Sequence, residues 1–96
     1  MRIRVKGYLN LREMIGDRLM QERVNDEVTL KDILDELELE LGSEFAEMIF
    51  DPKTGGVNKY IAILINGQHH THLPDKLDTA LEDGDEVAIF PPMAGG

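Results

Sequence analysis

Cysteine is absent from this chain of 96 residues. The chain therefore cannot form a disulfide, bind a metal through a thiolate, or use a cysteine nucleophile or a persulfide of its own. Long apolar runs are lacking as well, since the longest, Tyr60 to Ile65, is far shorter than the roughly 20 residues that span a bilayer. The first six residues alternate in character and contain no apolar signal-peptide core, so we expect a cytoplasmic protein.

Basic residues are scarce relative to acidic ones. The chain has 10 Lys and Arg against 19 Asp and Glu, which gives a net charge of −9. This balance argues against nucleic acids and anionic membrane surfaces as partners, because both would repel the protein. The signs are unevenly placed: residues 1–25 carry six bases and three acids, whereas residues 26–96 carry four bases and sixteen acids. The length and the 42% of hydrophobic residues fit one folded domain.

Catalytic and phosphate-binding motifs are also missing. The sequence has no Gly-rich loop followed by lysine and suggests no Ser, His and Asp arrangement, and Gly55-Gly56 is typical of a turn. His70 and His72 lie two positions apart, so on a strand they would share one face and could ligate zinc, with His69 facing the other way. No third ligand is visible nearby, so we expect ordinary hairpin histidines and no metal site.

A cluster of acidic residues lies between positions 32 and 47, at a spacing that predicts one helical surface. Its members are Asp32, Asp35, Glu36, Glu38, Glu40, Glu44 and Glu47. Two interpretations remain open: a solvated face that keeps the protein in solution, or an electrostatic docking surface for a partner.

Hydrophobic periodicity predicts the order of the elements. We expect strands over residues 2–9, 18–25, 60–65, 68–72 and 86–90, and a short helical turn over 11–16. The main helix should run from Leu30 to Leu41, because Thr29 and Asp32 form a capping pair before it and Gly42 follows it. Ser43 should cap a second short helix.

These elements predict an α+β fold. The run from Tyr60 to Ile65 suggests a central strand buried on both faces, and Asn66-Gly67 predicts a hairpin turn after it. One long helix and four or five strands must bury a shared apolar face. We therefore expect a mixed four- to five-stranded sheet packed on one main helix.

The C-terminal segment is unusual in composition. After the last expected strand ends at Phe90, two prolines stop sheet pairing and favour an extended chain, and four small or flexible residues follow. The segment is Pro91, Pro92, Met93, Ala94, Gly95 and Gly96. We expect a folded domain over 1–90 and a slim tail over 91–96 that can thread a narrow channel and deliver a terminal carboxylate to a buried site. A frayed terminus is the alternative.

The residues from Asp83 to Gly96 resemble the end of MoaD/ThiS-like proteins, which are ubiquitin-like β-grasp sulfur carriers. The Phe-Pro-Pro-x-Ala-Gly-Gly ending is similar to that of molybdopterin synthase small subunits. The strand at Ile3 to Val5, the triplet Leu11-Arg12-Glu13 and the Asn66-Gly67 turn also resemble this family. The resemblance implies a ubiquitin-like β-grasp whose first and last strands are parallel neighbours at the sheet centre. The stretch 43–59 is similar to that of longer, archaeal-type carriers.

The resemblance also implies a chemistry for the terminal glycine. A ubiquitin-activating-like adenylyltransferase would use ATP and magnesium to adenylate Gly96, and sulfur from a persulfide donor would then leave a thiocarboxylate there. The residues from Pro91 to Gly95 would thread into the molybdopterin synthase large subunit, where the sulfur passes to a pterin precursor. The chain itself would bind no cofactor and would act as a carrier rather than as a catalyst alone.

A docking surface is expected beside the tail. On the last strand Val87 and Ile89 should face the helix, so Phe90 should point outward. Tyr8 should lie beside Phe90, and His69 would join them as partner contacts. An exposed aromatic pair is a common anchor of an interface. The alternative is that the two rings only cover the edge of the core.

Four functions are compatible with these features. The resemblance favours a sulfur carrier for molybdopterin or tungstopterin synthesis. The alternatives are a carrier for tRNA thiolation or thiamine synthesis, a protein modifier that is conjugated through Gly96, and a plain ubiquitin-like binding domain.

Overall fold

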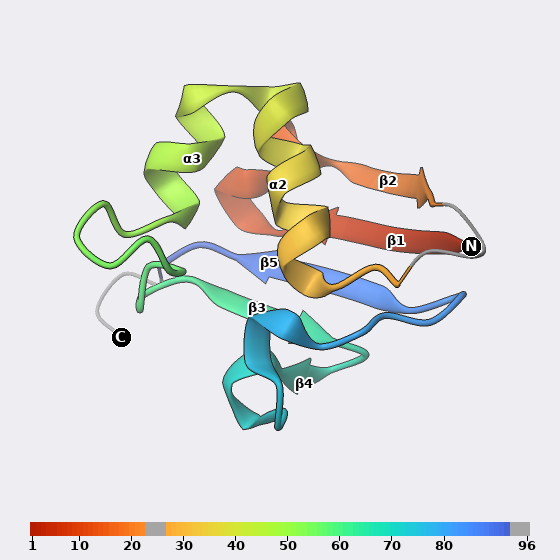
Figure 1. The fold of residues 1–96 in the computed structure, drawn as a ribbon. Coiled ribbons are helices and arrows are strands. Elements are labelled where there is room, and N and C mark those ends of the chain that lie inside the picture. Colours follow the sequence, from red (N-terminus) through yellow and green to blue (C-terminus); the bar gives the residue numbers. More distant parts are fainter. Residues whose placement is uncertain (23–26, 93–96) are drawn as a thin grey trace.

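The computed structural model describes residues 1–22 and 27–92 and shows one mixed sheet with helices packed on it (Figure 1). The strands are β1 (Arg2–Gly7), β2 (Asp17–Gln21), β3 (Ala62–Ile65), β4 (Gln68–His69) and β5 (Glu86–Phe90). The helices are α1 (Arg12–Ile15), α2 (Leu30–Leu41) and α3 (Ser43–Ile49). Short 3-10 turns lie at Leu9–Leu11, His70–His72 and Lys76–Asp78.

The sheet has the order β2-β1-β5-β3-β4, so β5 occupies its centre. β1 runs parallel to β5, with Arg4 opposite Glu86, whereas β3 runs antiparallel to β5, with Ala62 opposite Phe90. The first and last strands are therefore parallel neighbours, as expected. This α+β arrangement, with α2 lying across one face of the sheet (Figure 1), is the expected β-grasp.

Helix α2 begins where the sequence predicts. The Thr29 side chain accepts a hydrogen bond from the backbone N–H of Asp32 at 3.2 Å, and the Asp32 carboxylate accepts one from the backbone N–H of Thr29 at 3.0 Å. This reciprocal pair satisfies two N–H groups at the helix start. Gly42 ends the helix with a φ of 84°. A glycine adopts this left-handed conformation without the penalty that a Cβ would impose.

The apolar stripe of α2 forms the centre of the core. Four of its residues are fully buried: Leu30, Ile33, Leu34 and Leu37. They meet inward-facing residues of the sheet, which include Ile3, Val5, Ile63, Val87 and Ile89, all 0% exposed. Leu39 lies on the opposite side of the helix and is 89% exposed, because it falls outside the 3.6-residue stripe.

The chain packs very closely where β1 ends. A Cβ on Gly7 would lie 2.5 Å from the Leu11 carbonyl oxygen and 2.8 Å from the Ile15 Cβ, so only glycine fits there. The segment from Leu9 to Ile15 thereby folds back over the end of β1, and the Gly7 N–H donates to the Gly16 carbonyl at 2.8 Å. This contact fixes the position of Tyr8 and of α1.

The structure corrects two strand predictions. The run from Tyr60 to Ile65 does not form a central strand buried on both faces: β3 covers only Ala62–Ile65 and lies next to the edge strand β4. Its residues alternate between half-buried and buried, and Tyr60 is 63% exposed, because only one face of the sheet is covered by α2. The strand expected at 18–25 begins at Asp17 and ends at Gln21, and residues 23–26 lie outside the described residues.

Two further predictions are wrong in detail. The strand expected over 68–72 ends at His69, and His70–His72 turn as a 3-10 helix, so His70 and His72 do not share a strand face. The cause is His70, whose ring is buried and bonds back to the carbonyl of Ile63. Gly42, rather than Ser43, is the N-cap of α3, and it makes no side-chain capping bond.

Within the described residues, none of the helices has the length and apolar character that crossing a membrane requires.

Candidate functional site

The face of the sheet that points away from α2 is built from alternate residues of each strand. Because Val87 and Ile89 are buried toward the helix, their neighbours Ala88 and Phe90 lie on the other face. The register places Lys6, Ala88, Leu64 and His69 side by side across four strands of this face. We call this surface the open face.

An aromatic pair lies at the end of the open face. The rings of Tyr8 and Phe90 stack with centroids 4.4 Å apart and planes 12° apart, and both residues are half-buried. The Tyr8 N–H donates to the Ile89 carbonyl at 3.0 Å, which holds the pair against the end of β5. The structure thus brings Tyr8 and Phe90 together as strand parity predicted. Their role as partner contacts stays a prediction.

The base of the expected tail adjoins this pair. β5 ends at Phe90, Pro91 is buried and Pro92 is exposed. A proline cannot donate to a strand ladder, so sheet pairing stops here. Four of the predicted tail residues lie outside the described residues: Met93, Ala94, Gly95 and Gly96. The division into a domain over 1–90 and a tail over 91–96, and the threading of that tail, therefore stay predictions.

The third predicted contact, His69, lies apart from the aromatic pair. It is on the edge strand β4, opposite Leu64, and β3 separates it from β5. Its ring stacks on His70 at 5.0 Å, and its Nδ1 accepts a hydrogen bond from the Thr71 backbone N–H at 3.2 Å. These contacts orient the ring at the border of the open face, and its part in partner binding stays a prediction.

The other two histidines have structural surroundings. His70 is 6% exposed, and its Nδ1–H donates to the Ile63 carbonyl at 3.2 Å. Burial lowers the pKa of His70, so the ring is neutral at neutral pH. His72 lies with its ring 5.7 Å from that of His69. Among residues 1–22 and 27–92, no three His, Asp or Glu side chains converge as a metal site would require.

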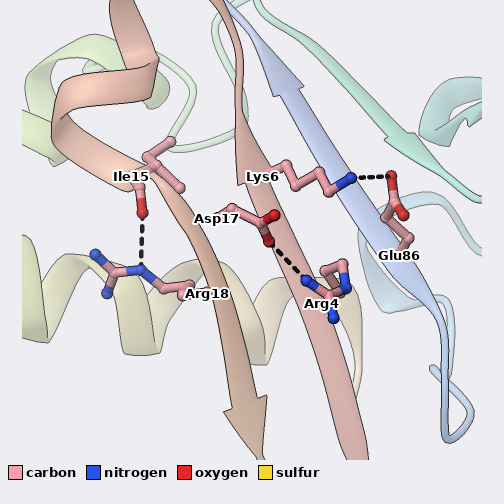
Figure 2. Close-up of polar contacts among 6 residues, drawn as sticks. All are labelled: Arg4, Lys6, Ile15, Asp17, Arg18 and Glu86. Carbon is pink, nitrogen blue, oxygen red and sulfur yellow. Dashed lines mark hydrogen bonds and ion pairs between the residues drawn. The ribbon is translucent and has the colours of Figure 1, made fainter.

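Two charged groupings were missed by sequence reasoning. On the open face, Asp17 contacts Arg4 at 2.9 Å, and Glu86 lies 3.9 Å from Lys6 (Figure 2). The alternation of Arg4 and Lys6 with buried residues in β1 is the signal that could have placed these bases there.

The second grouping joins α2 to the end of β2. The adjacent carboxyl group of Glu22, with partial burial and the other neighbouring carboxylates, raises the pKa of Glu36 to about 7. Close by, Arg18 contacts Glu40 at 2.9 Å. No local pattern reveals the carboxyl pair, because its members lie in different elements.

Comparison with known proteins agrees with this architecture. The model of the ThiS family matches residues 8–96. Small archaeal modifier protein 3 of Haloferax volcanii is 38% identical over the full length of both chains. The solution structure of small archaeal modifier protein 1 from Methanosarcina acetivorans superimposes with a TM-score of 0.79 at 29% identity, covering 99% of this chain and 96% of that one.

A more distant match extends the fold comparison. A Pyrococcus furiosus protein described as molybdopterin converting factor subunit 1 superimposes with a TM-score of 0.71, covering 97% of this chain and 99% of that one. At 20% identity this likeness concerns the fold alone. The family match and the full-length modifier relative together show that this chain belongs to the ThiS family of ubiquitin-like sulfur carriers and modifiers.

Proposed function

We propose that this chain is a sulfur carrier whose terminal residue, Gly96, is adenylated and converted to a thiocarboxylate. The observation that carries the proposal is the end of β5, where the central strand stops at Phe90 beside Tyr8 and two prolines lead the chain off the sheet. The chain therefore leaves the sheet beside a surface suited to docking, and the segment that follows Pro92 in the sequence is poor in side chains. The absence of cysteine fits a division of labour in which partners supply both the nucleotide and the sulfur.

The chemistry starts from an unreactive group, because a carboxylate is a poor acyl donor. On the adenylyltransferase, a carboxylate oxygen of Gly96 attacks the α-phosphorus of ATP, and pyrophosphate leaves with magnesium. A donor persulfide then attacks the acyl carbon and expels AMP. A second thiol of the donor cleaves the resulting S–S bond and is oxidised to a disulfide, which releases the thiocarboxylate on Gly96.

The open face supplies the docking surface in this proposal. Tyr8 and Phe90 form its aromatic anchor, with His69 at its border. Stacked rings at the centre of an interface contribute large contact area at low loss of side-chain freedom. The same anchor would serve the adenylyltransferase and the protein that accepts the sulfur, since the tail must enter both.

The acceptor that we propose is the large subunit of molybdopterin synthase. The support is the Phe-Pro-Pro-x-Ala-Gly-Gly ending from Phe90 to Gly96, which is similar to that of the small subunits of this enzyme. In such a complex Pro91 to Gly95 thread a channel of the large subunit, and the thiocarboxylate passes its sulfur to a pterin precursor. The catalytic groups then belong to the large subunit.

A second candidate function is protein modification. It is favoured by the full-length relative at 38% identity, which is named a small archaeal modifier protein. The two functions share the adenylate on Gly96 and differ in the nucleophile that attacks it. A lysine amine gives an isopeptide bond and releases AMP, whereas a persulfide leads to the thiocarboxylate.

The experiment that tests the carrier is measurement of intact mass. The chain is incubated with the adenylyltransferase, ATP, magnesium and a persulfide donor, and replacement of one oxygen by sulfur is expected in the wild type. Deletion of Gly96 should abolish the gain while the fold is kept, because a terminal glycine makes few contacts. Gly95→Val should impair it through bulk and backbone restriction. Sulfur gained at wild-type yield after the deletion would refute the role of Gly96.

A second measurement separates the two candidate functions. The thiocarboxylate form is mixed with the synthase large subunit and the pterin precursor, and a dithiolene product is expected. Conjugates of higher mass on a denaturing gel, without that product, would favour the modifier.

A further inference from the structure

A pocket of about 230 Å³ lies where the open face meets α1. It is lined by Lys6, Gly7, Tyr8, Arg12, Gly16 and Asp17. Tyr8 also belongs to the stacked pair with Phe90, so the pocket is continuous with the proposed docking surface. We call it the Arg12 pocket.

The shape of the Arg12 pocket is fixed by backbone. Gly7 admits no side chain, because a Cβ would lie 2.5 Å from the Leu11 carbonyl oxygen. Gly16 has a φ of 70° and accepts the Gly7 N–H at 2.8 Å. The floor between these glycines is therefore backbone, and it leaves room for a short side chain of a partner.

The Arg12 pocket carries an excess of positive charge. Its acidic residue, Asp17, is paired with Arg4 at 2.9 Å, and Lys6 has only a loose contact to Glu86 at 3.9 Å (Figure 2). Arg12 is exposed and, within residues 1–22 and 27–92, makes none of the ion pairs found at 4.0 Å or less. Within this part of the chain, the guanidinium at the rim is therefore left without a carboxylate.

The rest of the described surface has the opposite sign. The acidic residues of α2 and α3 are exposed on the side of the molecule that α2 covers, and the whole chain carries −9. An acidic partner surface would be repelled over most approaches and attracted at the Arg12 pocket. Such a local contrast orients a partner before the tight contacts form.

We propose that the Arg12 pocket receives an Asp or Glu side chain of the adenylyltransferase. Arg12 donates to that carboxylate through two N–H groups, Lys6 adds a second positive charge, and the Tyr8 ring covers the methylene stem. The inference rests on the proposed function, since it names the chemistry by which the activating partner is recognised. It assigns to Arg12 a specificity role that the aromatic pair cannot provide.

The test compares variants of equal charge change at two places. Arg12→Glu, in the full chain, should raise the Kd for the adenylyltransferase about tenfold or more. It should also make that Kd vary less with salt concentration. Arg12→Lys should lose less, because the charge is kept and the two-pronged contact is lost. Lys76→Glu in the 3-10 turn Lys76–Asp78 is the matched control, since this turn contacts α2 on the other side of the sheet, and its Kd should stay within about twofold.

The results separate the two proposals. Wild-type binding and adenylation with no change on Arg12→Glu would overturn the Arg12 pocket and leave the carrier function standing. Equal weakening by Lys76→Glu would also overturn it, because net charge alone would then explain the effect. Failure of the wild type to bind would overturn the carrier proposal and the pocket with it.

A rescue experiment identifies the chemistry of the occupant. Exposed Asp and Glu residues of the adenylyltransferase are changed singly to Arg and tested against Arg12→Glu. Recovery of most of the lost affinity by one reversed pair is expected if a carboxylate fills the pocket. Recovery by none of them would overturn the assignment.

Discussion

The two faces of β5 belong to the same five residues and have opposite surroundings. Toward α2, Val87 and Ile89 are fully buried in the core. Away from it, Phe90 is half-buried and stacks on Tyr8 rather than on the core. One side of β5 therefore contributes to the stability of the domain, and the other side forms part of a surface that a partner can recognise. Mutations on the two sides should separate these properties.

The largest expected effect on the buried side comes from Ile89→Ala. Removing a fully buried isoleucine leaves a cavity beside α2 and should lower the free energy of unfolding by about 3 kcal/mol. Urea denaturation followed by circular dichroism measures it. A loss below about 1 kcal/mol would contradict the assignment of this side of β5 to the core.

A mutation on the open face should weaken partner binding more than it lowers stability. Phe90→Ala should weaken binding to the adenylyltransferase by about 2 kcal/mol, because a buried aromatic anchor is lost from the interface. Unfolding should change by no more than about 1 kcal/mol, since the ring is half-buried and its stack with Tyr8 lies outside the core. Calorimetric binding and urea denaturation are measured on the same variant. Normal binding with easy unfolding would show that Phe90 only covers the core edge.

A smaller effect on stability concerns the polar contact between α2 and the end of β2, on the side of the sheet that α2 covers. The pKa of Glu36 is raised from 4.5 to about 7, so the folded state holds this proton more tightly than the unfolded state. The stabilisation is complete below about pH 4.5 and is lost as the pH rises through about 7. Because Glu36 is exposed, we expect a loss of only about 1 kcal/mol.

Glu36→Gln tests this pH dependence. The amide stays neutral beside Glu22 at every pH, so the variant should lose less stability than the wild type between about pH 5 and pH 8. Glu38→Gln, on the same helix, is the matched control and should keep the wild-type profile. Identical profiles for Glu36→Gln and the wild type in thermal melts would show that the carboxyl pair does not act on stability.

The sequence predicted most accurately the features whose causes are local. Helix α2 begins and ends as expected because Thr29, Asp32 and Gly42 lie next to the bonds that they make. Strand parity also placed Tyr8 beside Phe90, once the first and last strands were expected to be neighbours. That expectation came from the family resemblance rather than from periodicity.

The predictions that were wrong depend on contacts between elements distant in the sequence. The apolar run before Asn66 suggested burial on both faces, but which faces are covered depends on where α2 lies. The short β4 follows from the bond of the His70 ring to the carbonyl of Ile63, which no pattern of alternation reports. The pairing of Glu22 with Glu36 and the Arg12 pocket likewise join elements distant in the sequence.

The parallel pairing of β1 with β5 has a consequence for biosynthesis. The pairing of these two strands places Arg4 opposite Glu86, so it forms only after β5 has left the ribosome. A nascent or truncated chain that lacks β5 leaves β1 and the apolar stripe of α2 exposed, and such surfaces are readily captured by chaperones and proteases. Only chains that include β5 can therefore complete the core, because Val87 and Ile89 belong to it.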